Sequence, residues 1–223
     1  MKTNLFAQAL LKFSLGLVLV GALIFLPAWT LDYWQGWLLM GILFLPMFLA
    51  GLILLKKNPE LLRKRLQAKE EQAEQKTVIL LSGLMFLAAF LLAGFNHRFE
   101  WITLPTWVPW AAAAAFLLAY ALYGEVLREN AYLSRTIEVQ EDQKVVDTGL
   151  YGIVRHPMYS ATLLLFLAMP LVLGSLLSFG VMLFYIPIIA KRIRNEEQVL
   201  AEGLKGYPEY MTKVKYRLIP GIW

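Results

Sequence analysis

Two polar clusters flank the longest apolar stretch of the chain. Residues 155–159 read Arg-His-Pro-Met-Tyr, and Arg192, Glu196 and Glu197 follow the stretch on its other side. If the intervening residues, 156–190, fold back on themselves, both clusters meet at one end of the hairpin. A carboxylate there accepts hydrogen bonds from hydroxyls or pairs with an ammonium group, aromatic faces attract cations, and a permanently charged arginine orients an anion. We therefore expect a polar site where hydrocarbon, headgroups and cytosol join.

Each cluster also has an ordinary structural explanation. Residues 155–157 before an apolar run are typical of a positively charged membrane anchor followed by a proline in the first helical turn. Glu196 and Glu197 with the neighbouring arginines are typical of solvated pairs on an exposed helix. Gln140 alone carries no signal, and His97 falls in an expected outer loop. Only the combination of the clusters favours a site.

Apolar windows dominate the rest of the sequence. Hydrophobic residues make up 59% of the chain and charged residues only 17%, with a mean hydropathy of +0.57, whereas soluble domains carry about 25% charged residues. Asp, Glu, Lys and Arg are absent from the windows 13–31, 33–55, 77–96, 101–124 and 156–190. A membrane-spanning helix needs about 20 apolar residues. The pattern predicts an integral membrane protein.

The last window is too long for a single span. Its 35 residues would form a helix of about 50 Å, against a hydrocarbon core of about 30 Å. Gly174-Ser175, shortly after Pro170, is the natural break. We expect a helix-turn-helix hairpin with short arms that other helices shield, then a separate charged cytoplasmic helix from Lys191 to about Gly206 and a tail rich in Tyr and Pro.

The predicted fold class is therefore an all-α integral membrane protein with five to six transmembrane helices. Residues 1–128 are expected to form two hairpins joined by a basic loop, 56–76, in which Asn58-Pro59 begins a partly amphipathic helix. Residues 129–223 are expected to hold the site, with a cytoplasmic loop, the hairpin 156–190 and a cytoplasmic tail.

The distribution of basic residues predicts the orientation. If the chain turns at Asp32, near Arg98 and at residues 173–175, then 20 of the 21 Lys and Arg residues lie on one side. The positive-inside rule places that side, with both termini and the site, in the cytoplasm, and we expect a prokaryotic inner or plasma membrane. Because each basic cluster adjoins an apolar span, we expect membrane lipids rather than nucleic acid as neighbours, and no obligate protein partner is evident.

Residue content also limits the chemistry. The chain has no cysteine and two histidines, which excludes disulfides and thiolate nucleophiles and argues against a transition-metal site.

Taken together, the motifs resemble a known family. The Arg-His-Pro-Met-Tyr segment, the hairpin, Arg-x-x-x-Glu-Glu (192–197), Gly-Tyr-Pro-Glu-Tyr (206–210) and Arg-Leu-Ile-Pro (217–220) resemble the isoprenylcysteine carboxyl methyltransferase family, which is related to phospholipid N-methyltransferases. The resemblance runs from about Val139 to Pro220; the family commonly has glycine where this chain has Ala161.

This resemblance implies an S-adenosyl-L-methionine-dependent methyltransferase embedded in the membrane. Its acceptor would be lipophilic or membrane-associated: an isoprenylcysteine carboxylate, a lipid amine or a small thiol. The residues that match the cofactor pocket are Gln140, Val145, Val146, Tyr151, His156, Pro157, Met158, Tyr159 and Glu196, and Arg192 matches an arginine on the substrate side. Glu197, about 100° further round the helix, is expected to point elsewhere and to matter less.

Two other functions remain open. Membrane sterol and steroid reductases carry a similar Arg-His-Pro-x-Tyr segment and bind NADPH. A non-enzymatic scaffold or small transporter is the second alternative, although a transporter is expected to place ionisable residues inside its spans, and these windows have essentially none.

Overall fold

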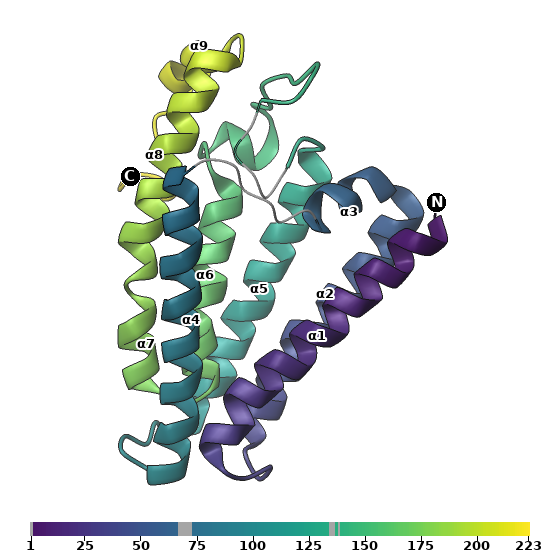
Figure 1. The fold of residues 1–223 in the computed structure, drawn as a ribbon. Helices are drawn as coiled ribbons and strands as arrows, with labels where there is room; N and C mark the ends of the chain where they lie inside the picture. The colour runs from purple at the N-terminus through teal and green to yellow at the C-terminus, as the bar shows by residue number, and fades with distance from the viewer. Residues whose placement is uncertain (1, 67–72, 134–136, 138) are drawn as a thin grey trace.

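The computed structural model describes residues 2–66, 73–133, 137 and 139–223 (Figure 1). Within these ranges all regular structure is helical, which confirms the predicted all-α class. The elements are α1 (Lys2–Ala28), α2 (Trp34–Lys57), α3 (Pro59–Leu66), α4 (Ala73–Phe99), α5 (Trp107–Glu129), the short 3-10 helix η1 (Gly149–Gly152), α6 (Pro157–Val172), α7 (Leu176–Met182), α8 (Tyr185–Gly203) and α9 (Tyr207–Lys213).

In the part of the chain that the structure describes, five stretches are long and apolar enough to cross a membrane. They are Leu5–Ala28, Trp34–Lys57, Lys76–Phe99, Trp107–Glu129 and Leu176–Gly203, and α6 is a shorter apolar helix. Many large apolar side chains on α1 and α2 are exposed, among them Leu15, Val18 and Leu45. Surface of this kind suits contact with lipid rather than water. The protein is therefore an integral membrane protein.

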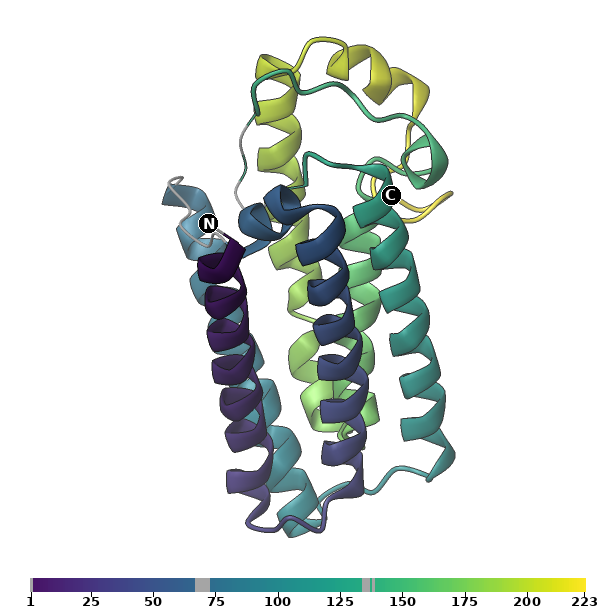
Figure 2. The same cartoon turned by 90° about the vertical axis from the view of Figure 1, so that its right-hand side faces the viewer.

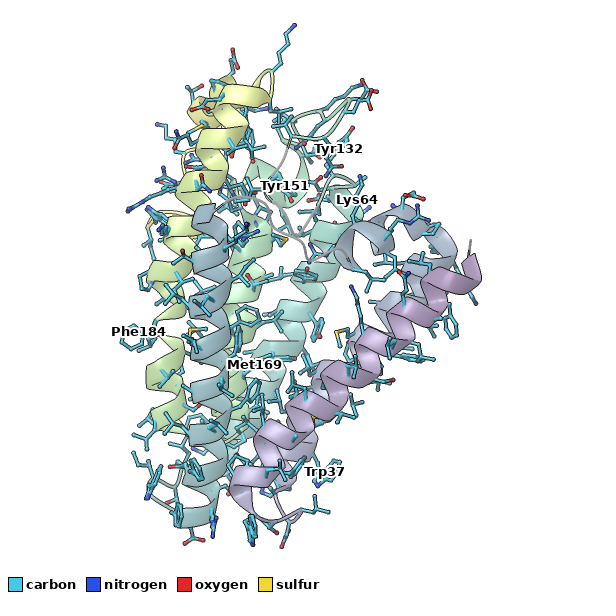
Figure 3. All side chains as sticks on the ribbon, in the orientation of Figure 1. Trp37, Lys64, Tyr132, Tyr151, Met169 and Phe184 are labelled. Atoms are coloured by element: carbon cyan, nitrogen blue, oxygen red, sulfur yellow. The ribbon has the colours of Figure 1, made fainter. Side chains whose placement is uncertain are left out.

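Most polar segments lie at one end of the bundle. The N-terminus, α3, the loop after α5 and α9 all lie toward this end, and the turns that follow α1 and α4 lie at the other (Figures 1 and 2). Side chains show the same division, with Lys64, Tyr132 and Tyr151 at the first end and Trp37 near the second (Figure 3). The fold thus brings the basic loops to one end, as their placement in the sequence predicted.

The hairpin turns where the sequence predicted. Pro170 lies near the end of α6, Gly174 has a positive φ of 69°, and the Ser175 side chain caps α7 by accepting a hydrogen bond from the Ser178 amide. A positive φ favours glycine because it has no Cβ. The first arm, α6, packs against α5, and the buried cluster that the two helices share contains small side chains such as Ala112 and Ala119. This close packing shields the arm, as expected.

The second arm differs from the prediction. A separate charged helix starting at Lys191 and ending near Gly206 was expected, but α8 runs without a break from Tyr185 to Gly203 and carries the charged residues on its second half. The break falls earlier, at Leu183 and Phe184. Pro187 explains it, because a proline ring collides with the carbonyl group four residues before it.

The α3 helix follows the N-terminal hairpin of α1 and α2 and lies at the polar end of the bundle (Figure 1). Its start at Asn58-Pro59 is confirmed: the Asn58 Oδ1 atom accepts a hydrogen bond from the Leu61 amide. Leu61 and Leu62 are buried, and the Lys64 Nζ atom donates to the Gln140 side chain. Residues 67–72 of the predicted loop 56–76 lie outside the described part of the chain. The helix therefore packs against the loop that follows α5.

Candidate functional site

A cavity opens at the polar end between the loop after α5, α6, α8 and α9. Its empty volume is about 820 Å³, including the part that is open to solvent. The predicted site residues that line it are Val145, Val146, Tyr151, His156, Met158, Tyr159, Arg192 and Glu196. The folded-back hairpin thus brings the two polar clusters of the sequence together, as predicted.

Three polar side chains form a connected chain in the cavity wall. Tyr159 lies in the first turn of α6, and Arg192 and Glu196 lie one turn apart on the same face of α8. The Tyr159 hydroxyl donates to the Glu196 Oε2 atom and accepts from the Arg192 Nε atom at 2.9 Å. We call Arg192, Tyr159 and Glu196 the cavity chain. It fixes a carboxylate and a guanidinium group at defined positions in one cavity.

Glu197, the next residue, belongs to a different group. Its carboxylate accepts hydrogen bonds from Arg155 Nε at 2.7 Å, from Arg217 Nε at 2.7 Å and from His156 Nε2 at 3.2 Å. Arg155, His156 and Glu197 are all buried. We call Arg155, His156, Glu197 and Arg217 the anchor cluster. Glu197 does not line the cavity, as expected. That it matters less for cofactor binding stays a prediction, while its contacts with two guanidinium groups and an imidazole give it a part in holding the fold.

His156 connects the two groups. Its Nε2 atom faces Glu197, its Nδ1 atom lies 4.0 Å from the Glu196 Oε1 atom, and its ring stacks on Tyr159 with centroids 5.7 Å apart. One buried imidazole therefore spans from the anchor cluster to the cavity chain.

The C-terminal tail fastens the start of α6. The Arg155 and His156 amides donate to the Tyr216 and Arg217 carbonyls, each at 2.9 Å, and the Ser160 hydroxyl donates to the Leu218 carbonyl at 2.7 Å. Through these bonds, the polar backbone groups at the start of α6 find hydrogen-bond partners within the protein. The tail thus forms part of the support on which His156 rests.

Tyr151 is fixed from both sides. Its hydroxyl accepts a hydrogen bond from the Asn130 side chain at 3.0 Å, and its carbonyl accepts one from the Tyr210 hydroxyl at 2.7 Å. Burial raises the pKa of the Tyr151 hydroxyl, so it stays protonated at neutral pH. Just before it, Gly149 has a φ of 52°, and an added Cβ would lie 1.3 Å from the Glu129 carboxylate, so the turn requires glycine.

Two predicted cofactor residues do not line the cavity. Gln140 accepts a hydrogen bond from Lys64 and donates one to the Tyr132 carbonyl, each at 2.5 Å, and so braces the loop against α3. Pro157 is buried in the first turn of α6, where proline suits the helix start.

Several lining residues had no predicted role. They include Asn130, Tyr132, Lys144, Arg155, Leu200, Leu204, Tyr207 and Tyr210. The two last-named tyrosines belong to the Gly-Tyr-Pro-Glu-Tyr motif, which was a signal in the sequence, whereas Asn130 and Tyr132 follow α5 in irregular chain without any pattern. Among the described residues there is no group of three or more His, Asp or Glu side chains that could hold a metal ion.

Comparison with known proteins gives a match to a family model and a match to a curated relative. The phospholipid methyltransferase family model matches residues 107–205, from the start of α5 to just past α8. The Delta(14)-sterol reductase of Mus musculus is 32% identical over 91 residues, which cover 40% of this chain and 22% of that relative. The match therefore spans about a fifth of the length of the reductase.

Proposed function

We propose that this protein transfers the methyl group of S-adenosyl-L-methionine to a lipophilic or membrane-associated acceptor, because residues 107–205 match the model of the phospholipid methyltransferase family, a family of integral membrane methyltransferases. The observation that carries the proposal is the cavity chain: a carboxylate and a guanidinium group held by one buried tyrosine, in a cavity beside the apolar helices.

The lining residues suit the cofactor group by group. Glu196 can accept hydrogen bonds from ribose hydroxyls or pair with the ammonium group. Tyr151 and Tyr159 offer faces for the adenine ring or the sulfonium cation. We assign His156 a contact with the cofactor carboxylate, and the apolar Val145 and Val146 form another part of the wall.

S-adenosyl-L-methionine supplies a methyl group on a cationic sulfur, which an acceptor displaces in line. The task of the protein is then to align donor and acceptor and to exclude water. Glu196 is held by Tyr159, and Arg192 orients an anionic part of the acceptor. We assign no proton transfer to His156, because its Nε2 atom already faces Glu197.

The acceptor approaches from the membrane in this proposal. An isoprenylcysteine carboxylate, a lipid amine and a small thiol all suit an interfacial site, and an apolar acceptor would enter sideways between helices. The polar cofactor would enter from the cytosol. Residues 129–223 would form the cofactor-binding region, supported by the two hairpins of residues 1–128.

Methyl transfer from labelled cofactor tests the proposal and sorts the acceptors. Membranes that contain the full chain are incubated with methyl-labelled S-adenosyl-L-methionine and then extracted with organic solvent. We expect label in the extract. Label that base releases as methanol indicates a carboxylate acceptor, and label in a base-stable lipid indicates an amine acceptor. Label in a volatile thioether indicates a thiol acceptor. Label no higher than in membranes without the protein would contradict the proposal.

A membrane reductase that uses NADPH is the second candidate, and the sterol reductase match favours it. Cationic lining residues such as Lys144 and Arg192 would also suit nucleotide phosphates. Oxidation of NADPH on addition of a sterol with a double bond at C14 would support this candidate. Methyl transfer without such oxidation of NADPH would exclude it.

We also propose that both termini and the cavity face the cytoplasm of a prokaryotic inner or plasma membrane. The basis is that 20 of 21 basic residues lie on one side of the predicted turns. Reporter fusions at Gln143 and after Trp223 should both read cytoplasmic. A fusion after Trp223 that reads external would contradict this orientation.

A further inference from the structure

Tyr207 lies in the cavity wall at the start of α9. Gly206 precedes it with a φ of 88°, a left-handed conformation that glycine adopts readily, and Pro208 follows in the first helical turn. This sharp turn places the Tyr207 ring against the cavity, with only 4% of the residue exposed.

The Tyr207 hydroxyl is buried and, among the described residues, has no hydrogen-bond partner. Buried polar groups in folded proteins are nearly always hydrogen-bonded, so a buried hydroxyl without a partner in the protein is a candidate contact for a bound molecule. Burial raises the pKa of this hydroxyl, so at neutral pH it is a hydrogen-bond donor.

The nearby Tyr210 differs from Tyr207 in the hydrogen bonding of its hydroxyl. The two rings lie 5.6 Å apart on the same short helix, and both line the cavity. The Tyr210 hydroxyl donates to the Tyr151 carbonyl at 2.7 Å. Protein structure alone therefore satisfies one hydroxyl of the pair and leaves the other without an acceptor.

The surroundings of Tyr207 indicate which part of a ligand would supply that acceptor. Arg192, Glu196, Leu200 and Leu204 follow one another at four-residue intervals and all line the cavity, so the wall changes from charged to apolar along α8. Tyr207 packs in one buried cluster with Leu204 and Tyr210, against which Leu200 also packs, and so lies at the apolar and aromatic end. A flat base with ring nitrogens suits this end, whereas charged groups suit the other.

We propose that the Tyr207 hydroxyl donates a hydrogen bond to the adenine base of the bound methyl donor and so helps to select a purine nucleoside. This inference rests on the proposed function and deepens it, because it assigns the base to the α9 end of the cavity and the ribose and amino-acid groups to the cavity chain.

The test is a Tyr207→Phe variant, which removes only the hydroxyl. S-adenosylhomocysteine is titrated onto the detergent-solubilised full chain, and the unfolding temperature of each ligand-free protein is measured. We expect the variant to bind about three- to tenfold more weakly, as for the loss of one hydrogen bond. We expect its unfolding temperature to be equal to that of the parent or higher, because no partner within the protein is lost.

Tyr216→Phe is the matched control, because Tyr216 is exposed and its side chain does not line the cavity; it should change neither quantity. Equal affinity of the parent and Tyr207→Phe would overturn this inference alone. A lower unfolding temperature of ligand-free Tyr207→Phe would also overturn it, because the hydroxyl would then have a structural partner. A parent that does not bind S-adenosylhomocysteine would overturn the proposed function together with the inference.

Discussion

The cavity chain and the anchor cluster are built from neighbouring residues of the same segments, yet their surroundings differ. Glu196 and Glu197 are adjacent on α8, but the Glu197 side chain is 5% exposed and the Glu196 side chain 23%. Glu197 accepts hydrogen bonds from three basic side chains, whereas Glu196 accepts its hydrogen bond within the cavity chain from the neutral Tyr159.

This difference separates residues that hold the fold together from residues that a ligand can contact. The anchor cluster satisfies its charges within the protein and joins the start of α6, α8 and the tail. The cavity chain presents a partly exposed carboxylate to the cavity. Substitutions of Glu197 or Arg217, which do not line the cavity, should therefore act mainly on stability, and substitutions in the cavity chain mainly on binding and turnover.

The largest expected effect is on the anchor cluster. Glu197→Ala leaves Arg155 buried without its carboxylate partner and should lower the free energy of unfolding by about 3–5 kcal/mol. Denaturant titration of the detergent-solubilised protein measures it. Glu202→Ala is the matched control on the exposed face of α8 and should stay within about 0.5 kcal/mol of the parent. A loss for Glu197→Ala as small as for the control would show that the cluster does not hold the fold.

The next effect is on cofactor affinity. Glu196→Ala should weaken binding of S-adenosylhomocysteine by about 1.5–3 kcal/mol, the range for a hydrogen bond to a charged group, with little change in the unfolding temperature. Calorimetric titration gives the affinity. Tyr159→Ala should weaken it as well, because the Tyr159 hydroxyl holds Glu196. Unchanged affinity in both variants would remove the cavity chain from the cofactor site.

Arg192→Ala should affect turnover and leave cofactor affinity largely unchanged. Its proposed partner is the acceptor, so the rate of methyl transfer should fall about ten- to hundredfold. Arg194→Ala, on the exposed side of the same helix, is the control and should keep the parent rate. A parallel loss of cofactor affinity in Arg192→Ala would place this residue on the donor side instead.

The smallest expected effect concerns an exposed ion pair outside both regions. The Lys213 ammonium lies 2.7 Å from Asp147 and lowers the pKa of that carboxyl group through a hydrogen bond and its charge. The pair therefore stabilises the folded state above the usual Asp pKa of about 3.9, and this contribution is lost as the pH falls through the lowered value. Asp147→Asn should lower the unfolding temperature slightly at neutral pH and not at strongly acidic pH. A large fall in the unfolding temperature at neutral pH would mean that the pair stabilises the folded state more than an exposed ion pair normally does.

Local patterns in the sequence predicted the hairpin and its meeting ends. Pro170 and Gly174 are strong turn signals, and the length of the apolar window forced a fold-back. The continuity of α8 was missed because the break next to Pro187 falls at Leu183 and Phe184, inside the apolar window, and not at its end before Lys191. Spacing on a helix also predicted that Glu196 and Glu197 point in different directions.

The partners of Glu197 could not be predicted, because they come from distant parts of the chain. Arg217 lies in the tail, and it reaches Glu197 only because tail carbonyls accept the amides of Arg155 and His156. Non-local pairing of this kind leaves no periodicity in the sequence. For the same reason, the sequence did not predict a role for Asn130, whose side chain at the end of α5 donates a hydrogen bond to Tyr151 in η1.

Binding of two nucleotides to the same protein tests the central claim most directly. The detergent-solubilised full chain is titrated with S-adenosylhomocysteine and, separately, with NADPH. The account predicts saturable binding of S-adenosylhomocysteine that Glu196→Ala weakens, and no saturable binding of NADPH. Saturable binding of NADPH alone would contradict the methyltransferase proposal and would favour the reductase.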